Sequence, residues 1–255
     1  MSPISILLIT CLLTYVGFTS ITNISSINKL ANDITSIIKD KYELEEMDAG
    51  EYEKILLYKI LPFSSKVYKI KDLGTLCFLT LNTGVMEMLS VNINAFTKDI
   101  PQVTIDFVSA FNSRTLLIEI YNLQVNKDNE YSQNFLKELD EIEKKYSNLK
   151  EAKASSSWYD EYLLKVIGKK GYVINDKYFL NIIKEIVEAY VASTEEAPKI
   201  SSDDQKKIID LYKEFSGNLV EKGGVAINNF IKSLGKEKTA EFLANVFYGY
   251  SGYMN

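Results

Sequence analysis

The chain has 255 residues, enough for one large domain or two small ones. Its formal net charge is −5, and all its basic residues except Arg114 are lysines, so the concentrated basic face of a nucleic-acid-binding protein is not expected. The absence of histidine excludes imidazole acid–base catalysis and histidine ligation of a metal or haem. The two cysteines, Cys11 and Cys77, are too far apart in sequence for a metal-binding motif.

Residues 4–18 form an apolar stretch whose length fits the hydrophobic region of a secretory signal peptide and is short for a membrane span. We therefore predict that residues 1–19 are a signal-like segment that directs the chain into the secretory pathway. A natively buried helix or a short membrane anchor is the alternative. The following Ser-, Thr- and Asn-rich segment, residues 20–38, suits the second half of a plastid-targeting signal, although Asp33 departs from its acid-poor composition. No other segment is hydrophobic enough to span a membrane.

Two helices are expected before the first strands. Apolar residues recur at helical spacing in Ser26–Lys41 and in Glu51–Leu61, and Pro62 would end the second helix. We assign residues 20–65 to an N-terminal helical and targeting region and residues 66–255 to the main domain. The main domain should begin with strands over 66–70, 73–81, 86–93, 103–108 and 115–121.

The connections between these strands are too short for helical crossovers, which predicts an antiparallel sheet. A further strand over 162–167 should end in a Gly-Lys-Lys-Gly turn at 168–171, and Gly235 should end a helix. The remaining periodic segments predict helices over 132–146, 177–192, 204–215, 225–234 and 236–247. This order of elements predicts the α/β class, as an α/β/α sandwich with a central, mostly antiparallel sheet flanked by helices.

Asp106 is the single acid in the apolar, β-branched run Val103–Val108. Burial of a carboxylate is costly unless the group is hydrogen-bonded, paired or used in chemistry. Asp106 is therefore the first candidate for a functional residue. The alternative is a structural acid that caps a loop or pairs with a lysine on an edge strand.

Strand alternation places Met86, Met88, Ser90 and Asn92 on one face of the strand that precedes Asp106. This face combines small polar groups with methionines. Such a surface suits a ligand pocket better than a plain hydrophobic core.

Three stretches make the chain similar to the ferredoxin-dependent bilin reductases and their relative, red chlorophyll catabolite reductase. The segment from Met86 through Pro101 and Asp106 to Ile120 resembles the strands around the family's P-x-x-G-x-D-x-V segment. Trp158 resembles a tryptophan that precedes the family's next strand. Residues 230–247 are similar to its terminal F-G-E-x-W … LF helix, and the resemblance covers residues 66–250.

The resemblance implies that a linear tetrapyrrole binds between the sheet and the C-terminal helices, without a bound organic cofactor. Reduced ferredoxin would supply single electrons, and acids in the pocket would supply protons. Asp106 falls on the family's central aspartate and is the expected proton donor. Ser90 falls where members carry histidine or asparagine, and its hydroxyl could at most orient a water or a pyrrole carbonyl. Met88 and Asn92 would line the substrate pocket, and Arg114 is a candidate for binding propionates.

Two departures from the family pattern affect the second proton donor. Residues 78–80 contain no acid where some members have a glutamate, and the segment from Glu221 to Gly224 stands where many have an aspartate. Glu221 is the candidate replacement. Glu119 is a further candidate, for which a structural role facing away from the pocket is the favoured interpretation.

Two other functions remain open. The missing histidine, the missing second aspartate and the negative net charge favour a tetrapyrrole-binding or carrier protein without catalysis, because acidic ferredoxin docks best on a basic surface. The third possibility is a secreted structural or interaction domain that binds no pigment.

Overall fold

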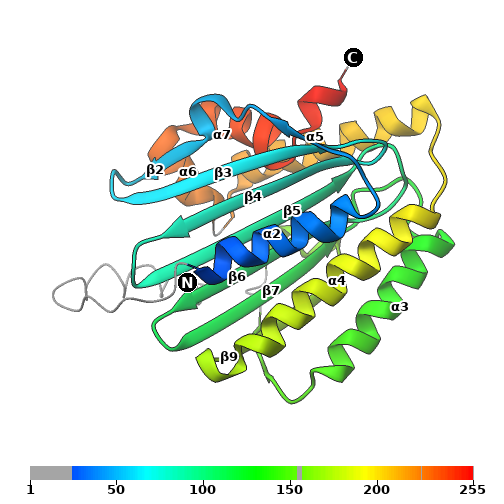
Figure 1. Ribbon diagram of the computed structural model, residues 1–255. Coiled ribbons are helices and arrows are strands. Elements are labelled where there is room, and N and C mark those ends of the chain that lie inside the picture. The colour runs from blue at the N-terminus through cyan, green and yellow to red at the C-terminus, as the bar shows by residue number, and fades with distance from the viewer. Residues whose placement is uncertain (1–24, 154–156, 225, 255) are drawn as a thin grey trace.

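The computed structural model of the chain describes residues 25–153, 157–224 and 226–254. Within these residues, nine strands form one antiparallel sheet in the order β1-β3-β4-β5-β6-β7-β9-β8, with β2 also paired to β3 (Figure 1). The strands are β1 (Leu44–Met47), β2 (Lys54–Leu57), β3 (Leu61–Ile70), β4 (Gly74–Asn82), β5 (Met86–Ala95), β6 (Gln102–Ala110), β7 (Ser113–Tyr121), β8 (Lys150–Glu151) and β9 (Leu163–Tyr172).

Helices cover both faces of this sheet (Figure 1). One face carries α2 (Ser25–Lys39), α3 (Glu130–Lys145) and α4 (Asp176–Glu196). The opposite face carries α5 (Ser202–Lys222), α6 (Ile227–Leu234) and α7 (Lys236–Phe242), and α7 continues into a wider helical turn over Leu243–Phe247. The predicted α/β/α sandwich with an antiparallel sheet is confirmed.

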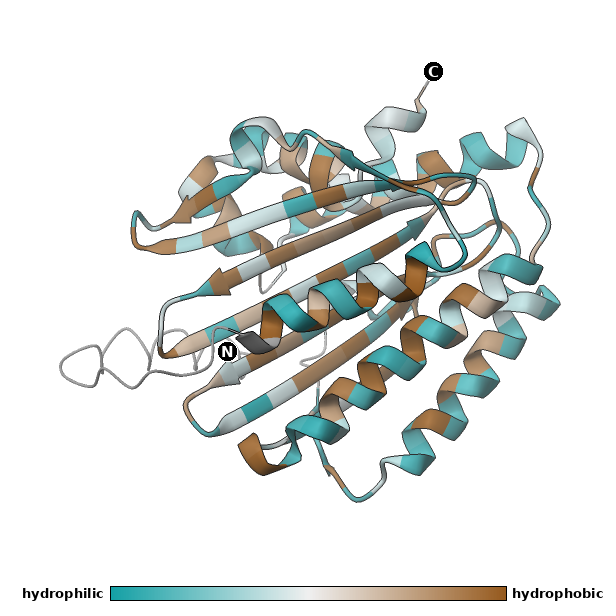
Figure 2. Ribbon diagram, in the orientation of Figure 1, coloured by the Kyte–Doolittle hydropathy of each residue, from teal (hydrophilic) through white to brown (hydrophobic). Residues whose placement is uncertain are grey.

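Strand alternation gives the sheet one apolar core on each face. On β5, Leu89 and Val91 pack with α2 and α4, whereas Met86 and Met88 pack toward the C-terminal helices. In Figure 2, α2 and α4 carry hydrophobic and hydrophilic residues in alternation along their length, as helices that cover a sheet do. Ser90 shares the side of the methionines, as predicted.

The predicted helix over Glu51–Leu61 is wrong. β2 and β3 pair there as an antiparallel hairpin. Tyr58 and Lys59 have φ angles of 53° and 62°, the geometry of a tight hairpin turn, although neither residue is glycine or asparagine. The segment from residue 44 to residue 65 therefore contributes β1, β2 and the start of β3 to the sheet, which corrects the predicted helical region over 20–65.

The predicted turn at 168–171 is also wrong, because β9 runs through it to Tyr172. Gly168 instead permits a close approach of another segment, since a Cβ atom there would lie 1.9 Å from the Ala152 carbonyl oxygen. The prediction that Gly235 ends a helix is confirmed, and its φ of 86° is a conformation that glycine adopts readily.

The predicted signal segment over residues 1–19, which contains Cys11, lies outside the described residues. No helix in the described part of the chain is long and apolar enough to cross a membrane. Cys77 is buried in the sheet, and burial raises the pKa of its thiol to about 12, so it behaves as an apolar core residue.

Candidate active site

Asp106 lies near the middle of the sheet on β6, on the face that the C-terminal helices cover. Its chain neighbours Ile105 and Phe107 are buried in the opposite core, whereas Asp106 keeps part of its surface accessible. Met88 on β5 and Leu117 on β7 are also only partly buried on this face. An acid between apolar side chains is thus left accessible on a face that is otherwise mostly buried.

Burial raises the pKa of Asp106 to about 6, because desolvation disfavours the charged carboxylate. The Ser90 hydroxyl, on the residue directly opposite on β5, forms a hydrogen bond that lowers the pKa in part. A carboxyl with this pKa exchanges its proton near neutral pH, as a general acid must.

A second acid, Glu119, lies on β7 on the same face as Asp106. Its cross-strand partner is Thr104, two residues from Asp106 along β6. Its side chain is buried, and the Tyr121 hydroxyl donates a hydrogen bond of 2.8 Å to its Oε2. Burial raises the pKa of Glu119 to about 7, with a further rise from the charge of Asp106 and a partial decrease from the Tyr121 hydrogen bond. The favoured prediction that Glu119 faces away from the pocket is therefore wrong.

Tyrosine side chains surround the two acids. The ring centroids of Tyr121 and Tyr159 lie 6.3 Å apart. Burial, followed by the charge of Glu119, raises the pKa of both Tyr159 and Tyr248, and Asp106 adds a smaller effect on each. These phenols stay protonated at neutral pH.

Trp158 ties this face to the end of α5. Its indole Nε1 donates a hydrogen bond of 2.7 Å to the Gly223 carbonyl, and the Lys222 ammonium lies 4.7 Å from the indole centroid. The ring also packs against Tyr159 and against Phe215 of α5. The tryptophan that supported the family resemblance therefore packs between Tyr159 and α5 on this face of the sheet.

Buried amides continue the same face beyond Asp106. Gln102 Nε2 donates hydrogen bonds to Asn92 Oδ1 and, at 2.8 Å, to Thr104 Oγ1. Asn92 Nδ2 and Gln102 Oε1 have no hydrogen-bond partner among the described residues. Buried amide groups of this kind are usually satisfied by ordered water or a ligand. Asn92 thus lies on the predicted face, together with an amide partner that the sequence did not single out.

The structure does not bring Glu221 to the carboxyl pair, which corrects its predicted place. Glu221 is exposed near the end of α5, and its Oε2 accepts a hydrogen bond of 2.9 Å from the Lys236 ammonium. Glu221 is the last residue but one of α5, and its side chain is 69% exposed to solvent.

Arg114 lies on the opposite face of the sheet, which corrects its predicted place at the pocket mouth. Its guanidinium binds Asp176 of α4 through two hydrogen bonds, of 2.7 Å and 3.2 Å. A further nitrogen donates to the carbonyls of Phe111 and Ser113. The side chain is thus fully engaged in holding α4 to the β6–β7 turn.

Sequence reasoning missed the tyrosines of the site. Side chains alternate between the two faces of a strand, so Tyr121, two residues after Glu119 on β7, could have been assigned to the same face from the sequence. Tyr248 follows the helical turn over Leu243–Phe247 and reaches the site only because the C-terminal segment folds back onto the sheet. There the Thr75 hydroxyl donates a hydrogen bond of 2.7 Å to the Tyr248 carbonyl. Among the described residues, no group of histidine, cysteine, aspartate or glutamate side chains is arranged to hold a metal ion.

The sequence matches no protein-family model and no curated protein. Among solved structures, the chain is similar to the crystal structure of phytochromobilin synthase from tomato in complex with biliverdin, with a TM-score of 0.73. The chain has the fold of phytochromobilin synthase. The match covers 90% of this chain and 85% of that one, at 11% sequence identity. The resemblance inferred from the motifs is therefore supported at the level of the fold.

Proposed function

We propose that the chain binds a linear tetrapyrrole on the Asp106 face of β5–β7 and reduces it with electrons from ferredoxin. The observation that carries this proposal is the pair of carboxyls, Asp106 and Glu119, with raised pKa values on one face beneath the C-terminal helices. The neighbour of this fold was crystallised with biliverdin, which supports the choice of ligand class.

Asp106 is the primary proton donor in this proposal. Reduction of one carbon–carbon double bond of the pigment takes up two electrons and two protons, and two reduced ferredoxins are oxidised in the process. With a pKa of about 6, Asp106 holds its proton far more often at neutral pH than an exposed aspartate does. Ser90 orients the carboxyl through their hydrogen bond.

Glu119 is the second proton-holding group, in place of Glu221. Its pKa of about 7 leaves it protonated in a large share of molecules at neutral pH. Tyr121 acts as a positioning residue because it fixes one carboxyl oxygen through its 2.8 Å hydrogen bond. The two carboxyls would therefore supply the two protons that one two-electron reduction consumes.

The remaining side chains would bind the pigment and limit water. Met88 and Leu117 offer partly accessible apolar surface beside Asp106. Asn92 Nδ2 and Gln102 Oε1 offer one free donor and one free acceptor, which match the carbonyl and N–H of a lactam ring. The predicted signal-like segment over residues 1–19 would direct the chain into the secretory pathway and onward to a plastid, where ferredoxin occurs, whereas α2 would stay in the folded domain because its apolar face is part of the core.

The test is an absorbance titration of the purified chain with biliverdin, followed by reduced ferredoxin under anaerobic conditions. A spectral shift on binding and new bands on reduction are the expected results. Binding without reduction would establish a carrier protein instead. No spectral change with any bilin would refute both pigment functions and leave the interaction domain.

A further inference from the structure

One end of the sheet carries exposed apolar side chains that the proposed reaction does not use. Here the β6–β7 turn meets the end of β9, joined by a hydrogen bond of 3.0 Å from the Val173 N–H to the Asn112 carbonyl. The exposed fractions are 53% for Phe111, 54% for Tyr172, 50% for Val173 and 85% for Ile174. We call these four residues the apolar tip.

Phe111 occupies an unusual place for a large apolar residue. Its φ is 51°, in the region that hairpin turns normally fill with glycine, asparagine or aspartate. Half of its side chain is in solvent, so packing within the chain does not account for it. The turn therefore exposes an aromatic ring at a position whose positive φ angle disfavours phenylalanine.

Three exposed lysines adjoin the apolar tip. Lys150 and Lys170 are cross-strand partners on β8 and β9, and Lys177 lies in the first turn of α4. None of them makes an ion pair with a described residue. The nearby acids are already paired, Asp176 with Arg114 and Glu151 with Lys169. Positive charge is therefore available at this end of a chain whose net charge is −5.

We propose that the apolar tip and these three lysines bind the surface of an anionic lipid bilayer. Apolar side chains flanked by lysines enter the interfacial region of a membrane while the ammonium groups meet acidic headgroups. Charge favours this occupant over a second copy of the chain, because a self-contact through the tip would oppose like charges. The tip also projects from two separate turns of the chain, one between β6 and β7 and one after β9.

Sedimentation of the full chain with vesicles tests the proposal. Wild type should bind vesicles of phosphatidylcholine and phosphatidylserine in equal parts and should bind pure phosphatidylcholine much less. The double variant Phe111→Asn/Ile174→Ser should bind the mixed vesicles roughly tenfold less, since it removes two inserting side chains. Lys170→Gln and Lys177→Gln should each weaken binding about fivefold.

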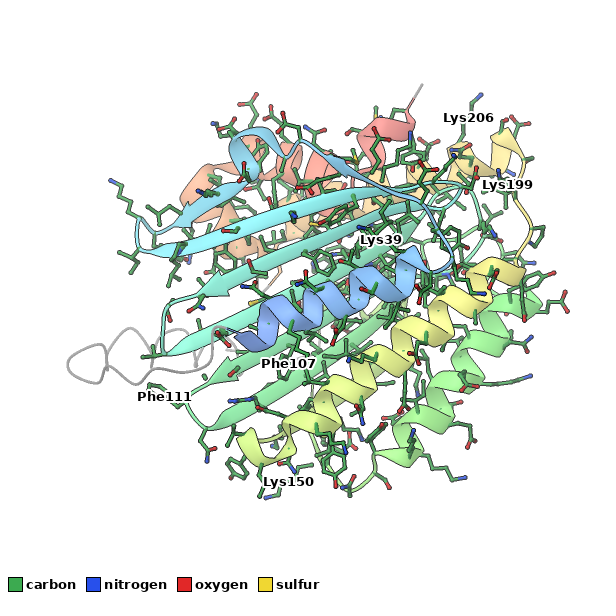
Figure 3. The ribbon with its side chains drawn as sticks, in the orientation of Figure 1. Lys39, Phe107, Phe111, Lys150, Lys199 and Lys206 are labelled. Atoms are coloured by element: carbon green, nitrogen blue, oxygen red, sulfur yellow. The ribbon has the colours of Figure 1, made fainter. Side chains whose placement is uncertain are left out.

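Matched controls lie at the opposite end of the sheet, where Figure 3 labels Lys206. Val125→Ser removes an apolar side chain that is 42% exposed there, and Lys206→Gln removes an exposed lysine, so both should bind as wild type does. Equal binding by wild type and the tip variants, or no binding by wild type, would overturn the proposal. A dimer in size-exclusion chromatography that the tip variants abolish would overturn it in favour of an interface between two copies.

Discussion

Asp106 and Glu119 share one face of two adjacent strands, and burial raises the pKa of both carboxyls. Asp106 has a hydrogen bond from Ser90 and retains some exposure, and its pKa is about 6. Glu119 is more deeply buried and also experiences the charge of Asp106, and its pKa is about 7. Because the two carboxyls interact, they titrate as a pair in two steps.

Replacing Asp106, the proposed proton donor, should separate pigment binding from reduction. Asp106→Asn keeps the size of the side chain and removes its transferable proton, so turnover of biliverdin should fall at least about a hundredfold. The pigment's dissociation constant should change by no more than a few fold. Anaerobic absorbance kinetics with reduced ferredoxin measure both quantities. Asp210→Asn, on the exposed side of α5, is the matched control, and full turnover by Asp106→Asn would remove Asp106 from the mechanism.

The Tyr121 hydroxyl should set the pH range of activity through Glu119. The proposed reaction needs both acids protonated, so the rate should fall as the pH rises through about 6, where Asp106 ionises, and further through about 7, where Glu119 ionises. Tyr121→Phe removes the hydrogen bond that lowers the pKa of Glu119, which should move this descending limb to higher pH. The rate of single-turnover reduction across pH measures the limb. An unchanged profile in Tyr121→Phe, compared with the exposed control Tyr178→Phe, would assign Glu119 no part in proton supply.

At the scale of elements, the strands around the site were predictable and the first hairpin was not. Alternation of apolar residues in Met86–Ala95 and Gln102–Ala110 matches the central strands to within two residues of the predicted bounds. The β2–β3 hairpin was hidden because its turn residues, Tyr58 and Lys59, give no glycine or asparagine signal. Its continuous apolar run, Ile55, Leu56 and Leu57, shows no alternation in the sequence, so a helix and a strand were equally compatible with it.

The candidate site was predictable only in part, for a related reason. Asp106 and Ser90 follow from a pattern within single strands, and the structure pairs them directly. The orientation of Glu119 depends on the register between β6 and β7, which the sequence does not state. Tyr248 depends on the path of the C-terminal segment, and Glu221 was placed by motif alone and lies in solvent.

A residue that tolerates a positive φ angle at position 111 should stabilise the β6–β7 turn. Phe111→Asn places a residue that tolerates positive φ at 51° and should raise the free energy of unfolding by about 1 kcal/mol. Urea unfolding followed by circular dichroism measures the change. Tyr172→Ser, at an equally exposed position in extended backbone, should stay within about 0.5 kcal/mol of wild type. A destabilised Phe111→Asn variant would mean that the phenylalanine ring supports the fold after all.

At the scale of the whole molecule, the sheet is one layer between two separate apolar cores, and the carboxyl pair belongs to only one of them. Ile105 and Phe107 pack toward α2 and α4, while Asp106 between them faces the C-terminal helices. The core under α2 and α4 contains the β-branched residues that fix the central strands. Burial of the two carboxyls can therefore destabilise one face of the sheet while the apolar core on the other face stabilises it.

Burial of Asp106 and Glu119 should make the stability of the fold depend on pH. The pKa values of Asp106 and Glu119 rise on folding, from 3.8 to about 6 and from 4.5 to about 7. Below about pH 4 both carboxyls are protonated in the folded and unfolded states, and stability is fully retained. Between about pH 4 and about pH 7 the unfolded chain loses these protons while the buried carboxyls still hold theirs, so stability should fall by roughly 3 kcal/mol for each carboxyl.

Urea unfolding of wild type and Glu119→Gln at a series of pH values isolates this effect. The difference between the two stability curves should grow from about pH 4 to about pH 7 and then level off, because the amide does not ionise. Asp210→Asn should show no such difference. Parallel curves for wild type and Glu119→Gln would place the ionisation of Glu119 outside this range.

Trp158, the single tryptophan of the chain, provides a built-in optical probe of the site. Its indole is fastened to the end of α5 through Gly223, so its emission reports on the junction between the sheet and the helix that covers the carboxyl pair. Linear tetrapyrroles absorb light in the near ultraviolet, where tryptophan emits, and a pigment bound beside Asp106 would quench that emission by energy transfer. Occupancy of the site is then readable from the unmodified protein, without a label and without any electron donor.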